Sequence, residues 1–171
     1  MYDVIFIDDE SDIRIAIEQS FALEDISAAF FPTAEEALLA IQNSGLPKVI
    51  ITDVCLPGLS GENVLTSIQK KDPNVPVILI TAHGDISMAV NALQNGAYDF
   101  IEKPFSTDRL IDTTKRAIEK RQLTLENLAL KRDLKTSQTL GPRIIWNTSP
   151  IQQLREQIAQ VGDTDADILI F

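Results

Sequence analysis

The sequence holds very little of several residue types and features that define whole classes of protein. Its 171 residues include one cysteine, one histidine and one tryptophan, so an internal disulfide and a zinc site of clustered Cys and His are both excluded. No apolar run approaches the ~18–20 residues that cross a bilayer. The first residues also lack the basic start and long apolar stretch of a secretory signal. We therefore expect a protein with no membrane span and a cytoplasmic location.

Basic side chains are scarce in the first part of the chain. Residues 1–106 carry 16 acidic and 5 basic side chains, whereas residues 107–140 carry 5 acidic and 8 basic ones. Because an acidic surface repels phosphate backbones, residues 1–106 are not expected to bind DNA. The basic segment contains no aromatic residue on which a base could stack. A solvated helix face is the favoured interpretation of that segment.

Strand-like and helix-like segments alternate along residues 1–106. Runs rich in β-branched and aromatic residues predict five strands at Val4–Ile7, Ile26–Phe31, Val49–Thr52, Val77–Thr81 and Tyr98–Ile101. The segments between them carry apolar residues at helical spacing, for example Ile13, Ile17 and Phe21. This alternation favours right-handed crossovers and a sheet covered on both faces. We expect an α/β fold with a doubly wound, five-stranded parallel sheet.

The pattern changes after residue 106, where helix formers continue without a strand to about residue 138. Apolar residues recur at a spacing of seven, at Ile111, Ile118 and Leu125. Arg121 and Thr124 interrupt this seam, so two interpretations remain open: a dimerising coiled coil, or a last helix packed on the sheet that then frays. Residues 141–171 contain a helical stretch and a final strand-like run. They predict the start of a further, larger domain.

Polar residues stand at the ends of four predicted strands. Asp8 and Asp9 follow the first strand, Asp53 the third, Thr81 ends the fourth, and Lys103 follows the fifth. Because the carboxyl ends of parallel strands meet at one edge, these side chains should converge. Three neighbouring carboxylates repel each other unless a cation neutralises them. The pattern predicts a Mg²⁺ site with oxygen ligands, completed by a phosphoryl oxygen.

The lysine gives this predicted site a second cation. An aspartate between Mg²⁺ and an ammonium is suited to attack phosphorus, because both cations neutralise the oxygens of the transferred group. Asp53 lies on the middle one of the three strands that carry the acids or the hydroxyl, and it is the predicted nucleophile. Thr81 can then donate a hydrogen bond to the phosphoryl group, and Lys103 can form an ion pair with it.

These residues resemble the receiver domains of two-component response regulators, over residues 1–122. The matching motifs are the acidic pair, the phospho-acceptor with its turn (Asp53 to Gly61), the hydroxyl residue and the Lys-Pro pair. The resemblance implies a CheY-like, flavodoxin-like sheet with strand order 2-1-3-4-5. It further implies direct Mg²⁺ contacts from Asp9, Asp53 and the backbone carbonyl of Cys55, with Asp8 acting largely through water, and a cis Lys103–Pro104 bond.

In this family a switch aromatic lies three residues before the lysine, and that position is Phe100 here. Phenylalanine has no hydroxyl, so only packing can distinguish its inward and outward states. Movement of Thr81 toward a phosphoryl group would open space for Phe100, and would alter the face formed by the fourth helix, fifth strand and fifth helix. An ordinary core position for Phe100 remains an equal alternative.

Two further segments, Thr81–Val90 and Gly96–Phe105, are similar to the NtrC group of sigma-54 activators, and within it to regulators of C4-dicarboxylate transport. The resemblance implies a receiver, a linker helix over 107–138 and an AAA+ ATPase that begins within 141–171. The implied partners are a sensor histidine kinase and a second copy, bound through linker helix and receiver face. Sigma-54 RNA polymerase and DNA would be contacted only by domains outside this chain. No phosphate-binding loop motif occurs here, so ATP binding is not expected.

Three rival functions share parts of this pattern. A haloacid-dehalogenase-like phosphohydrolase needs a second aspartate two positions after the nucleophile, where this chain has Cys55. A flavodoxin-like electron carrier needs a phosphate-binding loop after the first strand, where Asp8, Asp9 and Glu10 would repel the flavin phosphate. A receiver that acts without phosphate, as an interaction module, remains open. We expect a phospho-accepting switch rather than an enzyme with turnover.

Overall fold

The computed structural model describes residues 2–82 and 86–138. The strands are β1 (Val4–Ile7), β2 (Ala28–Phe31), β3 (Val49–Asp53), β4 (Val77–Thr81) and β5 (Asp99–Glu102). The helices are α1 (Ser11–Leu23), α2 (Ala34–Ser44), α3 (Gly61–Lys71), α4 (Ile86–Gln94) and α5 (Thr107–Gln138). The predicted helical and strand-like stretches within residues 141–171 lie outside the described residues.

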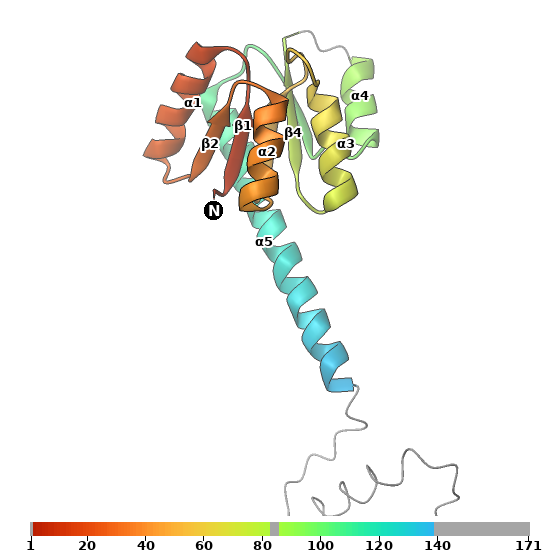
Figure 1. Ribbon diagram of the computed structural model, residues 1–171. Coiled ribbons are helices and arrows are strands. Elements are labelled where there is room, and N and C mark those ends of the chain that lie inside the picture. Colours follow the sequence, from red (N-terminus) through yellow and green to blue (C-terminus); the bar gives the residue numbers. More distant parts are fainter. Residues whose placement is uncertain (1, 83–85, 139–171) are drawn as a thin grey trace, which may run out of the picture. The chain divides into compact units, whose positions relative to one another are not determined.

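All five strands form one parallel sheet in the order β2-β1-β3-β4-β5 (Figure 1). This confirms the predicted fold class and strand order. The second strand is shorter than predicted, because Ile26 and Ser27 precede its first paired residue, Ala28. In the sheet, β2 lies on one side of β1 and β3 lies on the other, so the strand order switches at β1. In open α/β sheets, ligands bind beyond the carboxyl ends of the strands at such a switch point, here β1 and β3.

Alternate residues of the central strands pack into two separate cores. On one face, Ile5 and Ile7 of β1 pack with apolar residues of α2, α3 and α4. On the other face, Val4 and Phe6 pack with α1 and the first part of α5. Because both faces are covered, the strands β1, β3 and β4 are buried at every position, as expected for a central parallel sheet.

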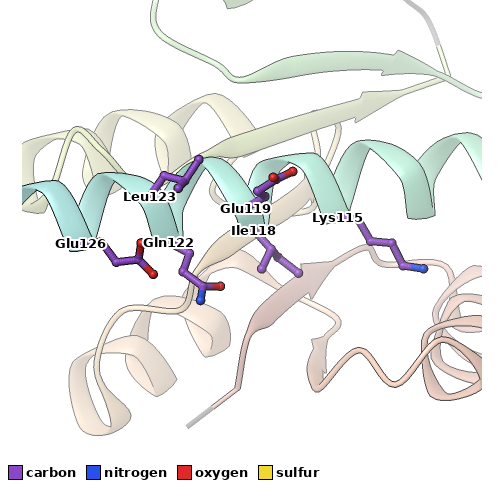
Figure 2. Close-up of a pocket in the computed structure, with 6 residues that line it drawn as sticks. All are labelled: Lys115, Ile118, Glu119, Gln122, Leu123 and Glu126. Carbon is purple, nitrogen blue, oxygen red and sulfur yellow. The ribbon is translucent and has the colours of Figure 1, made fainter.

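The last helix carries exposed apolar residues beyond its packed first turns. Leu110 and Ala117 are fully buried against the sheet, whereas five leucines further along are exposed: Leu123, Leu125, Leu128, Leu130 and Leu134. Side chains from the middle of α5 line a surface pocket, with Leu123 on its border (Figure 2). The extended C-terminal helix of the predicted fold is therefore present.

No helix among the described residues has the length and hydropathy of a membrane span.

Candidate phosphoryl-acceptor site

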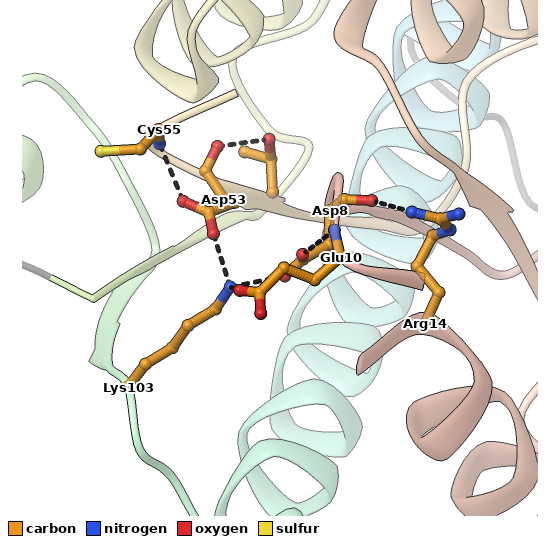
Figure 3. Close-up of polar contacts among 7 residues, drawn as sticks. Asp8, Glu10, Arg14, Asp53, Cys55 and Lys103 are labelled. Carbon is orange, nitrogen blue, oxygen red and sulfur yellow. Dashed lines mark hydrogen bonds and ion pairs between the residues drawn. The ribbon is translucent and has the colours of Figure 1, made fainter. Parts of the chain in front are cut away.

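The carboxyl ends of β1, β3 and β5 bring Asp8, Asp53 and Lys103 together. The Lys103 ammonium lies 2.6 Å from Asp53 Oδ2 and 2.8 Å from Asp8 Oδ2 (Figure 3). Asp8 is fully buried and Asp53 is 5% exposed. Side chains from three separate strand ends thus meet at one edge of the sheet, where the strand-end argument predicts them.

A third carboxylate, that of Glu10, completes the arrangement around the lysine. Glu10 Oε1 accepts a hydrogen bond from Lys103 Nζ at 3.0 Å, and the Glu10 N–H donates to Asp8 Oδ1 at 2.9 Å. Glu10 was not among the predicted site residues. Asp9, which was, is exposed and does not belong to the group of carboxylates formed by Asp8, Glu10 and Asp53.

The backbone after β3 fixes the nucleophile candidate. Asp53 Oδ1 accepts a hydrogen bond from the Cys55 N–H at 2.8 Å, while Oδ2 faces Lys103, so each carboxylate oxygen has one partner. A Cβ at Gly61 would collide with the Asp53 backbone oxygen. The first residue of α3 must therefore be glycine for the helix to lie this close to Asp53. The Cys55 side chain is exposed.

A contact from α2 holds the turn between β3 and α3. Glu35 Oε1 accepts a hydrogen bond from the Leu59 N–H at 3.0 Å. Gly58, which precedes Leu59, has a φ of 84°, a backbone conformation that residues other than glycine adopt only at a cost in free energy. The turn that follows the phospho-acceptor candidate is therefore tied to a neighbouring helix.

Thr81 also lies at this edge, whereas Phe100 lies further back in β5, where it pairs with Leu79 of β4. Thr81, at the end of β4, is fully buried. Phe100 in β5 is half-buried and packs against the core on the α2–α3–α4 face. The Lys103–Pro104 peptide bond is cis, as the family resemblance implies.

Burial and the three carboxylates determine the electrostatics of the site. Burial raises the pKa of the Asp8 carboxyl, and the hydrogen bonds from Lys103 and Glu10 reverse this only in part. Burial acts to lower the pKa of Lys103, but the hydrogen bonds to Asp53, Asp8 and Glu10 outweigh it, so the pKa is raised. The lysine is therefore firmly charged, and the site retains an excess of negative charge.

The residues present fit a divalent cation. Asp8 Oδ2 is buried, and beyond its ion pair with the Lys103 ammonium at 2.8 Å it accepts no hydrogen bond. Carboxylate oxygens of Asp8, Glu10 and Asp53 all lie within 4.8 Å of one another. A compact set of oxygens with net negative charge, including a buried one whose partner is Lys103 alone, suits Mg²⁺, which prefers oxygen ligands and keeps several waters.

A family model described as the response regulator receiver domain matches residues 4–115. The chain belongs to the response regulator receiver family.

Relatives named DctD, NtrX and NtrC confirm the resemblance to the NtrC group. The chain is 40% identical over 167 residues to the C4-dicarboxylate transport transcriptional regulatory protein DctD of Rhizobium meliloti, covering 98% of this chain and 36% of that protein. Among solved structures, NtrX from Brucella abortus has a TM-score of 0.69 at 35% identity, covering 98% of this chain and 36% of that one. The beryllofluoride-activated NtrC4 receiver domain dimer has a TM-score of 0.65 at 36% identity, covering 69% and 97% respectively. The chain thus spans about a third of the length of the curated relatives it matches.

Proposed function

We propose that this receiver is a Mg²⁺-dependent phosphorylation switch whose phospho-acceptor is Asp53 and whose donor is the phosphohistidine of a sensor kinase. The observation that carries the proposal is the Lys103 ammonium, which lies 2.6 Å from Asp53 Oδ2. This ammonium places a positive charge beside Asp53, which ends β3 at the position of the phospho-acceptor in this family.

The transfer is an in-line displacement at phosphorus. A carboxylate oxygen of Asp53 forms the new P–O bond, the P–N bond of the phosphohistidine breaks, and the electron pair returns to the donor's imidazole. Lys103 neutralises charge on the phosphoryl oxygens, and Thr81 donates a hydrogen bond to one of them. Mg²⁺, when bound, supplies further charge neutralisation and orients the phosphoryl group.

The Mg²⁺ ligands belong to this proposal as well. Asp53, the backbone carbonyl of Cys55 and Asp9 would hold the ion directly, and Asp8 would contribute largely through water. The fully buried Asp8, whose Oδ2 is paired with Lys103 alone, supports a further cation at this edge. Asp9 lies outside the cluster of Asp8, Glu10 and Asp53, so its carboxylate would have to move toward that cluster to hold the ion.

Thr81 and Phe100 transmit the effect of phosphorylation from the site to another face of the receiver. When Thr81 moves toward the phosphoryl group, it opens space into which the Phe100 ring packs, and the face of α4, β5 and α5 changes. The Phe100 ring is half-buried against the core. This supports a ring that can pack in either an inward or an outward position.

The output is a sigma-54-activating AAA+ ATPase that begins within residues 141–171 of a longer protein, with 1–122 as the receiver and 107–138 as the linker helix. The linker and receiver face hold two copies together, sigma-54 RNA polymerase and DNA contact other domains, and the protein works in the cytoplasm. Likeness to DctD supports this output and suggests C4-dicarboxylate transport genes as targets. Likeness to the NtrC4 receiver domain, whose activated form is a dimer, supports pairing.

Intact-mass spectrometry after incubation with acetyl phosphate tests the proposal. We expect one phosphoryl adduct in the parent with Mg²⁺, and none without Mg²⁺ or in Asp53→Ala. Lack of an adduct in the parent would favour the phosphate-independent interaction receiver. Continuous release of phosphate from small esters would instead favour a phosphohydrolase.

A further inference from the structure

The Lys103 ammonium is crowded by carboxylates before any phosphoryl group arrives. Oxygens of Asp53, Asp8 and Glu10 lie 2.6, 2.8 and 3.0 Å from Nζ. A lysine ammonium has three N–H donors and no more. A phosphoryl oxygen that binds this lysine must therefore displace one of the three carboxylates.

The three carboxylates differ in what their release would cost. Asp8 has no exposed surface and Asp53 almost none, so release of either one while the donor's phosphoryl group approaches, before the P–O bond forms, would leave an unpaired buried charge. The Glu10 side chain is 59% exposed, and its contact to Nζ is the longest of the three. An exposed ion pair contributes little to stability, and when the pair is broken the carboxylate is again hydrated by water.

The backbone of Glu10 is fixed even though its side chain is free to leave. Its N–H donates to Asp8 Oδ1 at 2.9 Å, and it occupies the residue before α1, at the position that caps a helix. Its side chain makes no capping hydrogen bond. The carboxylate therefore has no role in starting the helix, and its contact in the site is the one to Lys103 (Figure 3).

We propose that Glu10 is a positioning residue that occupies, in the unphosphorylated receiver, the place on Lys103 that a phosphoryl oxygen takes. Its carboxylate holds the ammonium at the site and competes with the incoming group for it. The inference rests on the proposed function, since it names the residue that sets how readily Asp53 accepts a phosphoryl group.

The test compares Glu10→Gln with Asp12→Asn, which removes the same charge from the exposed first turn of α1. The first measurement is the ¹⁵Nζ resonance of Lys103 in Mg²⁺-free protein, assigned from its loss in Lys103→Arg. We expect Glu10→Gln to shift this resonance and Asp12→Asn to leave it in place. An unchanged resonance in Glu10→Gln would overturn the inference, even if no phosphoryl uptake occurred and the proposed function failed.

The second measurement is the initial rate of phosphoryl uptake from acetyl phosphate at saturating Mg²⁺. We expect Glu10→Gln to raise this rate by about two- to fivefold, the effect of removing an ion pair with one exposed partner. Part of the gain should persist at high salt, because the Lys103 side chain is 11% exposed and a partly buried pair is screened less. Any gain in Asp12→Asn should vanish there, because distant charges are screened. An equal rate in Glu10→Gln and parent, or a gain that salt abolishes, would contradict the inference. Weaker Mg²⁺ binding with slower uptake in Glu10→Gln would also overturn it, and would make Glu10 a metal ligand.

Discussion

Arg121, in the middle of α5, donates a hydrogen bond at 2.6 Å to Asp72, the residue that ends α3. The arginine is 6% exposed, and its second terminal nitrogen has no hydrogen-bond partner. The predicted solvated face of this helix thus contains one buried cation. The pair joins α5 to the edge of the sheet opposite the site, since Asp72 precedes β4.

Asp72→Asn should destabilise the receiver by leaving Arg121 buried without its anion. Loss of a hydrogen bond to a buried charged group costs about 1–3 kcal/mol, and urea unfolding at pH 7 measures it. Glu24→Gln, which breaks the exposed pair with Lys115, is the control and should change stability little. Equal losses in the two variants would contradict a special role for the Arg121 pair.

The same pair predicts sensitivity to acid. Burial acts to raise the pKa of Asp72, but the hydrogen bonds from Arg121 and Asn74 outweigh it, so the pKa is lowered. A lowered pKa means that the pair stabilises the fold above pH ~4, the ordinary aspartate value, and that this contribution is lost as pH falls further. Parent and Asp72→Asn should therefore converge in stability on acidification. A constant difference from pH 7 down to pH 2 would contradict this account.

Asp8→Asn should stabilise the Mg²⁺-free protein at neutral pH. Burial raises the pKa of Asp8, so the folded state favours the protonated form and the ionised carboxylate lowers stability at pH 7. The gain should be on the order of 1 kcal/mol and should disappear below pH ~4, where the group is protonated in both states.

Mg²⁺ provides the complementary measurement for Asp8. Thermal unfolding should shift upward with Mg²⁺ in the parent, and much less in Asp8→Asn, because ligands that bind the native state raise its stability. Asp12→Asn should behave like the parent in both experiments. Lower stability of Asp8→Asn at pH 7 without Mg²⁺, or a full Mg²⁺ response, would contradict the proposed site.

The exposed leucines of α5 predict a second copy as their partner. Leu125 and Leu128 are 44% and 38% exposed, and their spacing of three suits a coiled-coil seam. Leu125→Lys with Leu128→Lys should convert a dimer into a monomer in sedimentation experiments. Leu39→Lys, at an exposed leucine of α2, should leave the dimer intact. A parent that is monomeric at every concentration, with and without a phosphate mimic, would contradict dimerisation.

The meeting of Asp8, Asp53 and Lys103 was predictable because of strand direction. Each residue ends or follows a strand of a parallel sheet, and the carboxyl ends of such strands share an edge. The acidic run also carried a signal for Glu10: an aspartate side chain often accepts a hydrogen bond from the backbone N–H two residues later. Asp8 accepts from the Glu10 N–H in this way and turns the chain after β1, so that Glu10 lies beside Lys103.

The burial of Arg121 was not predictable in the same way. Its contact with Asp72 joins residues 49 positions apart and depends on the angle at which α5 crosses the end of α3. Local spacing along a helix carries no information about that angle. The sequence indicated only that Arg121 interrupts an apolar seam.

The most direct test of the central claim is to locate the phosphoryl group chemically. Reduction of the phosphorylated protein with borohydride converts an aspartyl phosphate to homoserine, and peptide mapping then identifies the residue. We predict homoserine at position 53, formed only with Mg²⁺ and phosphodonor together, and no conversion in Asp53→Asn. Conversion at another aspartate, or none in a parent shown to be folded, would contradict the assignment of Asp53 as the acceptor.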